Sequence, residues 1–273
     1  MLKSKTLNVR EKDGLVYLTF PRFDECGVRH AFTTRMGGVS RGEYASFNTG
    51  FDRGEDYDTV YENYRRLCAA IGIDEKRLVL SKQTHTNNVR TVCEQDIGNG
   101  IVKPQAFSDV DGLISGLSGV GLVTQYADCV PLAFYDKSKK IIATSHSGWR
   151  GTVAEIGRVT VEQMVRDFSS DPRDIIAGIG PCIGSCCYEV DAPVYNAFSE
   201  IGYMPLNKIF KEKPNGKYML DLKMANKYIL IHAGISEENI DVADLCTNCE
   251  HEYLHSHRYT GGKRGNLGLI IAL

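Results

Sequence analysis

Strand-like runs crowd the stretch between residues 112 and 145, too close together for helices to connect them. The runs cover residues 112–115, 121–126, 132–135 and 141–145. Two parallel strands need a crossover of a dozen or more residues, usually a helix, whereas antiparallel neighbours need only a short turn. These spacings therefore disfavour a strict βαβ succession and a doubly wound parallel sheet. We expect a mixed β-sheet instead.

The rest of the sequence predicts further strands and a few helices. Runs of apolar, β-branched and aromatic residues predict strands over 15–20, 28–34, 78–81, 175–179, 218–222 and 267–273. Apolar residues recur at helical spacing over 60–71, 153–168, 192–201 and 222–233. Because no repeat, linker or charge block marks a boundary, we predict one domain over residues 1–273. Its class is α/β, with a mixed β-sheet core and helices on the outer faces.

The charge and the cysteine content limit the classes of partner that we expect the chain to bind. Thirty-two Lys and Arg against 34 Asp and Glu leave a net charge of −2, so no basic surplus is available to neutralise nucleic-acid phosphates. The longest apolar run, 267–273, is far shorter than the ~20 residues that span a bilayer, and no signal peptide is readable. Nine cysteines, an odd number in a chain of this size, indicate a reducing compartment. We expect a cytoplasmic monomer or weak homodimer that binds small molecules, with neither nucleic acid nor membrane as partner.

Metal-binding and nucleophilic residues concentrate where predicted strands end. His85, Cys129 and His146 each follow closely on such a run, and Asp128 stands beside the cysteine. A catalytic zinc commonly takes three nitrogen or thiolate ligands and keeps a fourth position open, so these residues are a candidate set. Their spacing is not diagnostic, because a lone His or Cys at a strand end is more often a core residue.

A second group of candidate ligands lies near the C-terminus. Cys246 and Cys249 form a CxxC pair, followed by His251, His255 and His257. The group could be a structural zinc site or a redox pair. The histidines follow the cysteines too closely for a zinc finger, however, and a loop with buried cysteines is the favoured interpretation.

Residues 178–190 hold three further cysteines, Cys182, Cys186 and Cys187, among several glycines. The glycines indicate a tight loop close to another backbone or a ligand, without the Gly-Lys-Ser/Thr end of a phosphate loop. Adjacent cysteines do not easily share one metal ion. The stretch 261–265 also lacks the preceding strand and following helix of a nucleotide-binding turn.

Ten short motifs follow one another along most of the chain. They are Thr33-Thr-Arg-Met-Gly-Gly-Val-Ser40, Ser46-Phe-Asn-Thr-Gly50, Gln83-Thr-His85, Asp109-Val-Asp-Gly-Leu-Ile114, Ala127-Asp-Cys-Val-Pro-Leu132, His146-Ser-Gly-Trp-Arg-Gly-Thr152, Gly180-Pro-Cys-Ile-Gly-Ser-Cys-Cys-Tyr-Glu-Val190, Asp221-Leu, Cys246-Thr-Asn-Cys249 and His255-Ser-His-Arg258. This array resembles the YfiH-like family, the laccase-domain proteins first called multicopper polyphenol oxidoreductases and later interpreted as zinc-dependent purine nucleoside phosphorylases. The resemblance runs from about residue 28 to the C-terminus.

The resemblance implies a single α/β domain, similar to a deamidase toxin of the cytotoxic-necrotizing-factor kind, with zinc held by His85, Cys129 and His146. It implies phosphorolysis of adenosine, inosine, guanosine and methylthioadenosine to base and ribose 1-phosphate, with adenosine deaminase activity besides. Purine nucleosides and phosphate are then the expected partners.

Further roles in this reaction are hypotheses. Arg35, Arg150 and Arg258 lie beside glycine or in turn-like sequence, and a guanidinium fork suits phosphate. Asn48 and Gln83 could orient ribose or phosphate. Asp128 could fix the tautomer of a ligand histidine.

Three alternatives remain open. Copper could take the zinc ligands, since copper(II) outbinds zinc at most nitrogen and sulfur sites, but a multicopper oxidase needs many histidines and the chain has seven. Cys129 as nucleophile with His146 as base would give an amidase or a hydrolase that edits cell-wall precursors. A metal-binding scaffold without catalysis would use Cys246, Cys249 and the nearby histidines.

Overall fold

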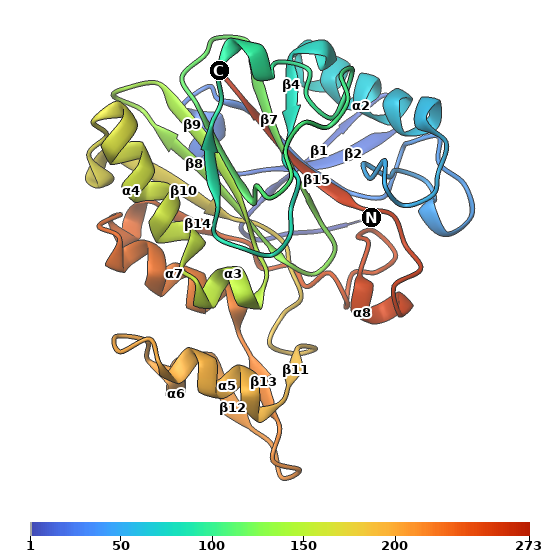
Figure 1. The fold of residues 1–273 in the computed structure, drawn as a ribbon. Helices are drawn as coiled ribbons and strands as arrows, with labels where there is room; N and C mark the ends of the chain where they lie inside the picture. Colours follow the sequence, from blue (N-terminus) through green and yellow to red (C-terminus); the bar gives the residue numbers. More distant parts are fainter. Residues whose placement is uncertain (1) are drawn as a thin grey trace.

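A computed structural model describes residues 2–273, in which two six-stranded sheets pack face to face with helices outside them (Figure 1). The strands are β1 (Asn8–Lys12), β2 (Leu15–Thr19), β3 (Arg29–Thr33), β4 (Leu78–Leu80), β5 (Val89–Thr91), β6 (Gly112–Ser115), β7 (Gly121–Tyr126), β8 (Val130–Asp136), β9 (Ile141–Ser147), β10 (Ile175–Ile179), β11 (Glu189–Val190), β12 (Phe210–Glu212), β13 (Tyr218–Leu220), β14 (Ile240–Val242) and β15 (Leu267–Ala272). The helices are α1 (Pro21–Glu25), α2 (Tyr57–Ile71), α3 (Trp149–Val153), α4 (Ile156–Phe168), α5 (Ala192–Ser199), α6 (Leu206–Ile209), α7 (Leu222–His232) and α8 (His257–Thr260).

Both large sheets are mixed, which confirms the predicted fold class. Their strand orders are β1-β2-β3-β15-β7-β4 and β14-β10-β8-β9-β6-β5. The β4–β7, β5–β6 and β10–β14 pairs are parallel, and the other neighbours are antiparallel. The expectation of one mixed sheet is corrected, because β7 joins the first sheet while β6, β8 and β9 join the second. Apolar runs buried on both faces do not reveal to which sheet a strand belongs.

Side chains that alternate along the central strands fill three apolar layers. On β7, Leu122 packs between the two sheets, whereas Val123 packs against the helix α2 side. On β8, Ala133 packs between the sheets, and Phe134 packs with residues of α4 and α7. Since successive side chains of a strand point to opposite faces, each central strand is covered twice. The result is a helix–sheet–sheet–helix sandwich, with one end available for the polar residues that follow the strands.

The predicted helix over 153–168 corresponds to α4, which begins at Ile156, and a separate short helix, α3, ends at Val153. Glu155 has a φ of 54°, in the left-handed region, and separates α3 from α4. That conformation interrupts the α-helical hydrogen-bond pattern, and it turns α3 toward the end of β9. The helical stripe of Thr160 and Met164 survives within α4 as its buried face.

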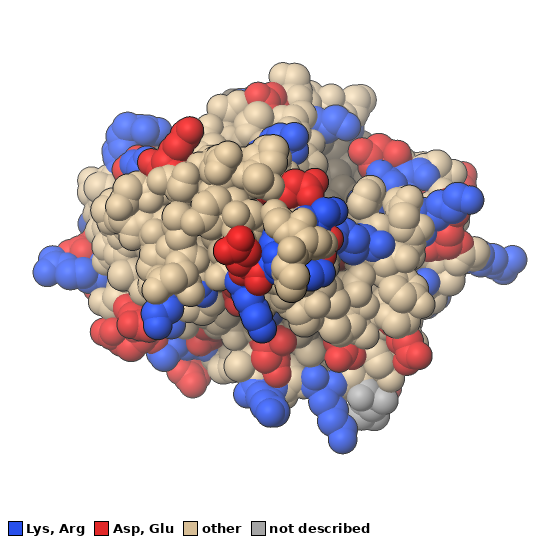
Figure 2. Space-filling model, turned by 90° about the horizontal axis from the view of Figure 1, so that it is seen from below, with Lys and Arg blue, Asp and Glu red and all other residues tan. Residues whose placement is uncertain are grey.

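A small three-stranded sheet, ordered β11-β13-β12, lies with α5 and α6 below the two large sheets in Figure 1. Strands β1, β5, β11, β12 and β14 are short or partly exposed, and their sequences carried no strand prediction. Figure 2 shows basic and acidic side chains interspersed over the face seen from below. Within residues 2–273, no helix combines the length and apolar character that a membrane span requires.

Candidate metal centre

His85, Cys129 and His146 come together at one end of the sandwich. His85 follows β4, Cys129 lies in the turn from β7 to β8, and His146 lies near the end of β9. Their candidate ligand atoms all lie within 4.8 Å of one another. The Cys129 Sγ is 3.9 Å from His85 Nε2, and the two imidazole rings meet edge to face with centroids 4.8 Å apart. Two ring nitrogens and one sulfur are a donor set that zinc accepts.

The backbone around the centre is shaped to bring these side chains together. His85 and Asp128 have φ values of 69° and 84°, in the left-handed region that non-glycine residues rarely adopt. Gly148, which precedes α3, passes directly behind the cluster. A Cβ at this position would come within 3.0 Å of His85 Cδ2 and 3.1 Å of Cys129 Sγ. The close approach of α3 to the centre therefore favours glycine, because a larger residue would press on both side chains.

Asp111 is a fully buried carboxylate that supports two of the three residues. Its Oδ1 lies 2.8 Å from His146 Nδ1 and accepts the His85 backbone N–H at 3.1 Å. Its Oδ2 accepts the backbone N–H groups of Thr84 and Thr86 at 2.8 and 3.1 Å. A proton on Nδ1 of His146 leaves the Nε2 lone pair for a metal. Burial opposes ionisation of Asp111, but His146 and these donors hold its pKa below the usual range.

The tautomer-fixing role expected of Asp128 thus falls to Asp111 in the structure. Asp128 instead accepts hydrogen bonds from the Thr247 hydroxyl at 2.6 Å and the Arg258 backbone N–H at 2.7 Å. The motif that begins at Asp109 carried the signal for Asp111. Sequence proximity to Cys129 favoured the wrong carboxylate, because strand pairing between β6 and β9 decides which one reaches His146.

Cys129 and His146 influence each other's protonation. Burial raises the pKa of the Cys129 thiol, but His146 and His85 lower it further, to about 6. Burial lowers the pKa of His146, but Cys129 and Asp111 raise it, to about 9. Near neutral pH the metal-free pair is therefore a thiolate beside an imidazolium. The thiolate is the form of cysteine that binds metals and attacks electrophiles.

The centre opens onto a cavity of about 390 Å³, which two arginines also line. Among the described residues, the Nε atoms of Arg53 and Arg264 are buried without a hydrogen-bond partner. Burial, together with nearby Arg53, lowers the pKa of Arg264 to about 10. Two guanidinium groups with unused donors beside one cavity suit a bound anion, because guanidinium binds phosphate or carboxylate through paired N–H groups.

Of the two amides predicted to orient substrate, Gln83 lines this cavity. Its side chain is engaged with the main chain of Gln125, accepting from its N–H and donating to its carbonyl, both at 2.7 Å. Asn48 is buried, and its Oδ1 accepts the backbone N–H groups of Gly50 and Asn266 at 2.8 Å. Asn48 therefore supports Asn266, which lines the cavity.

The three predicted arginines are absent from the lining of the cavity, as far as residues 2–273 define it. Arg35 donates to the carbonyls of Ala45 and His251 at 2.7 and 3.1 Å. Arg150 stacks over Trp149 at 4.2 Å. Arg258 donates to the carbonyls of Cys187 and Glu189, both at 3.3 Å. Their part in phosphate binding stays a prediction.

Arg53 and Arg264 are cavity residues that the sequence did not predict. Arg264 stands between Lys263 and Gly265, in a turn-like setting similar to that of the selected arginines. Residues 261–265 lack the preceding strand and the following helix of a nucleotide-binding turn, so their sequence did not indicate a binding site. Arg53 follows the Ser46–Gly50 motif by three residues and could have been selected by the same criterion of loop position.

The fold and the centre define an α/β protein with a candidate metal site open to a cavity. Residues 29–273 match the family described as multi-copper polyphenol oxidoreductase laccase, and the chain belongs to this family. The purine nucleoside phosphorylase YlmD of Bacillus subtilis is 37% identical over 245 residues, which are 89% of this chain and 87% of that protein. An adenosine deaminase from an unknown prokaryotic organism is 35% identical over 238 residues, 86% of this chain and 90% of that protein. The crystal structure of Bacillus licheniformis hypothetical protein YfiH aligns with a TM-score of 0.92 and 33% identity, covering 97% of this chain and 98% of that one.

Proposed function

We propose that the protein is a zinc-dependent purine nucleoside phosphorylase with adenosine, inosine, guanosine and methylthioadenosine as substrates. One observation carries the proposal: the His85, Cys129 and His146 cluster shares a cavity with Arg53 and Arg264, whose buried Nε donors lack partners among the described residues. A metal ligand set and an anion site side by side suit a reaction between phosphate and a neutral substrate. The name of the Bacillus subtilis relative supports the same reaction class.

The residues fit a zinc ion. Asp111 keeps the proton of His146 on Nδ1, Cys129 is ionised near neutral pH, and the fourth side of the cluster faces the cavity. When bound, zinc supplies Lewis-acid stabilisation of negative charge in the cavity. Copper would also accept these donors, so metal analysis of the purified protein has to include both.

The two cavity arginines have a direct role in this proposal. Arg53 and Arg264, which line the cavity, would hold phosphate by charge-assisted hydrogen bonds from their guanidinium groups. A phosphate oxygen then forms a bond to ribose C1′ while the bond from C1′ to N9 breaks. The electron pair of that bond leaves with the purine, which takes up one proton. Positioning of the two reactants supplies a large part of the rate gain in such a displacement.

The aromatic wall of the cavity suits a purine ring. Phe51 lines the cavity and stacks on Tyr57 and Tyr64, with ring centroids 5.0 and 5.5 Å apart. Offset stacking of flat rings is favourable, and this stack is held by α2. We propose that the base lies against Phe51, with the ribose toward the metal cluster.

Two other reactions of the same centre follow from specific observations. Adenosine deamination, with water as the attacking group, is supported by the name of the second relative. A cysteine-dependent hydrolase is supported by the Cys129 thiolate beside the protonated His146. The hydrolase would work without metal, whereas the phosphorylase and deaminase would not.

We further propose that the enzyme acts in the cytoplasm as one domain over residues 1–273, alone or as a weak homodimer. All nine cysteines are free thiols, which suits a reducing compartment. Nucleosides and phosphate are the proposed partners. Light scattering during size-exclusion chromatography would give the oligomeric state.

The test is incubation of zinc-loaded protein with adenosine or inosine, with and without phosphate, followed by chromatography of the products. We expect free base to appear only when phosphate is present, and inosine to appear slowly from adenosine in either case. Arg264→Ala should weaken phosphate binding and so raise the KM for phosphate. Arg166→Ala, on the exposed face of α4, serves as the matched control. Equal base release without phosphate would overturn phosphorolysis, and full activity after chelation would favour the cysteine hydrolase.

A further inference from the structure

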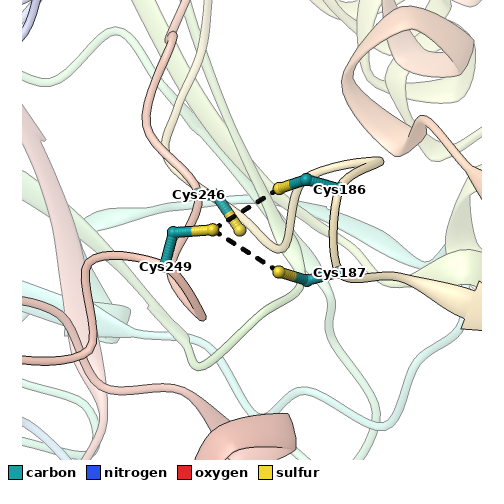
Figure 3. Close-up of side chains that lie close together, drawn as sticks. All are labelled: Cys186, Cys187, Cys246 and Cys249. Carbon is teal, nitrogen blue, oxygen red and sulfur yellow. Dashed lines mark hydrogen bonds between the residues drawn. The ribbon is translucent and has the colours of Figure 1, made fainter.

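Four cysteines outside the cavity form a second cluster, where two loops meet. Cys186 and Cys187 belong to the connection after β10, and Cys246 and Cys249 to the connection after β14 (Figure 3). Their sulfur atoms point toward one another and all lie within 4.8 Å. Cys249 Sγ is 3.5 Å from the sulfurs of both Cys186 and Cys187.

These distances fit a shared metal better than a disulfide. Zinc binds thiolates at about 2.3 Å in a tetrahedron, which places the sulfurs of one site about 3.8 Å apart by simple geometry. A disulfide needs a separation of about 2.05 Å and joins only one pair. Cys249 is equally far from two partners, so no single pair is preferred. The cluster therefore has the dimensions of a four-thiolate site.

The backbone between the cysteines is shaped around the sulfurs. The N–H groups of Cys187 and Tyr188 both donate to the Gly184 carbonyl at 2.9 Å. This turn directs the two adjacent side chains to the same side, so that both sulfurs reach the cluster although the residues are neighbours in sequence. A Cβ on Gly184 would lie 3.2 Å from Cys186 Sγ and 3.3 Å from Cys246 Sγ. The glycine leaves room for the cluster.

Two N–H groups donate to the sulfurs, and one arginine contacts the adjoining backbone. The backbone N–H of Gly184 donates to Cys246 Sγ at 3.1 Å, and the Asn248 side-chain amide donates to Cys187 Sγ at 3.2 Å. Arg258 donates to the Cys187 carbonyl at 3.3 Å. Four thiolates around a divalent cation carry a net charge of −2, and such donors and cations stabilise it.

We propose that Cys186, Cys187, Cys246 and Cys249 bind one zinc ion that fastens the β10 and β14 connections together. The histidines that follow the CxxC pair are not needed as ligands, and His251 Nδ1 instead lies 3.0 Å from the Asn248 carbonyl. Four protein ligands complete the tetrahedron and leave no position for substrate, so this zinc is structural.

The site also reaches the candidate catalytic centre. Thr247, between the two CxxC cysteines, donates to the Asp128 carboxylate at 2.6 Å. Ile183, in the other connection, donates its N–H to the Asp128 carbonyl at 3.0 Å. Asp128 has left-handed backbone geometry and immediately precedes Cys129. The structural zinc thus holds both loops against the turn that presents Cys129.

The experiment is zinc and iron analysis, with X-ray absorption at the zinc edge, on protein purified without chelators. The set comprises wild type, His85→Ala, Cys249→Ser and, as a matched control at an exposed thiol outside both clusters, Cys26→Ser. We expect about two zinc ions per chain in wild type and Cys26→Ser, and about one in each other variant. The zinc retained by His85→Ala should have four sulfur neighbours at about 2.3 Å.

The His85→Ala protein keeps the test decisive even if Cys249→Ser fails to fold. Zinc with nitrogen neighbours in that variant would be bound by His146 and Cys129, and would overturn the proposal. Zinc absent from that variant, iron in its place, or a disulfide from Cys249 to Cys186 or Cys187 in the fresh protein would overturn it too. Because the readout is metal content and coordination, loss of the proposed phosphorylase activity would leave this result unchanged.

Discussion

The two cysteine-bearing clusters of this protein differ in their donors and in their access. His85, Cys129 and His146 offer three mixed donors and open onto a cavity of about 390 Å³. The cluster of Cys186, Cys187, Cys246 and Cys249 offers four sulfur donors at a junction of loops. Three ligands beside a cavity leave space for a reacting molecule, whereas four ligands complete the coordination of zinc. The number of donors and the free space beside them therefore distinguish a catalytic from a structural role.

The comparison predicts first that His85→Ala disables the cluster beside the cavity and leaves the four-cysteine cluster unchanged. Loss of one of only three ligands should lower phosphorolysis about a thousandfold or more, since metal stabilisation of charge is worth several kcal/mol. The four-cysteine zinc should remain. Initial rates of inosine phosphorolysis and zinc content, measured on the same sample, check both halves. Retained phosphorolysis in His85→Ala would contradict a catalytic role of this cluster.

A second difference is expected in thiol reactivity after the metals have been stripped by chelation. The pKa of Cys129 is lowered to about 6 despite burial, because of His146 and His85, whereas burial raises that of Cys186 to about 11. Alkylation of Cys129 should rise through pH 6 and level off, while that of Cys186 should still be rising at pH 9.

At pH 7 the thiolate fractions differ by about four orders of magnitude, and the weaker nucleophilicity of the more acidic thiol reduces the rate difference to about a hundredfold. Peptide mass spectrometry after timed iodoacetamide treatment measures both rates. Equal rates for the two cysteines at pH 7 would contradict the assigned electrostatics of the centre. Cys26, an exposed thiol that belongs to neither cluster, provides the internal reference.

Asp111→Asn should weaken zinc binding at the open centre about 10- to 100-fold, because it removes the charged partner that fixes His146. The same change at Asp128, whose carboxylate accepts hydrogen bonds from Thr247 and Arg258, should have a smaller effect on zinc affinity. Competition with a chromophoric chelator measures both affinities. A larger loss with Asp128→Asn would reverse the two assignments.

The smallest effect on turnover is expected for Cys249→Ser. Removing one ligand of the structural zinc should lower the melting temperature by several degrees, since about 1 kcal/mol corresponds to 2–4 °C for a chain of this size. Turnover should fall only a few-fold, through the loosened Asp128 turn. Calorimetry and rate measurements, with Cys26→Ser as control, check this. A loss of turnover as large as that of His85→Ala would contradict a purely structural role of the four-cysteine cluster.

The two clusters also differ in how far the sequence predicts them. His85, Cys129 and His146 follow readable strands, and rigid strand ends place side chains reliably. The four-cysteine cluster combines residues about 60 positions apart in irregular loops, and only the turn at Gly184 shows that adjacent cysteines can face one way. Local sequence patterns carry no information about that meeting of loops.

The fold shows the same limit on what the sequence predicts. Strands such as β6, β7 and β10 begin and end where their apolar runs predict, because burial on both faces leaves a clear pattern. Their division between two sheets depends on tertiary pairing, as does the choice of Asp111 over Asp128. The two arginines of the cavity were not predicted for a related reason, since Arg53 and Arg264 meet only after distant loops have packed.

The most direct measurement of the central claim is phosphorus NMR of inosine incubated with zinc-loaded protein and phosphate. The account predicts a growing ribose 1-phosphate signal with wild type and, at a lower rate, with Cys249→Ser, and none with His85→Ala. No ribose 1-phosphate from the zinc-loaded wild type, or an equal signal from His85→Ala, would contradict it.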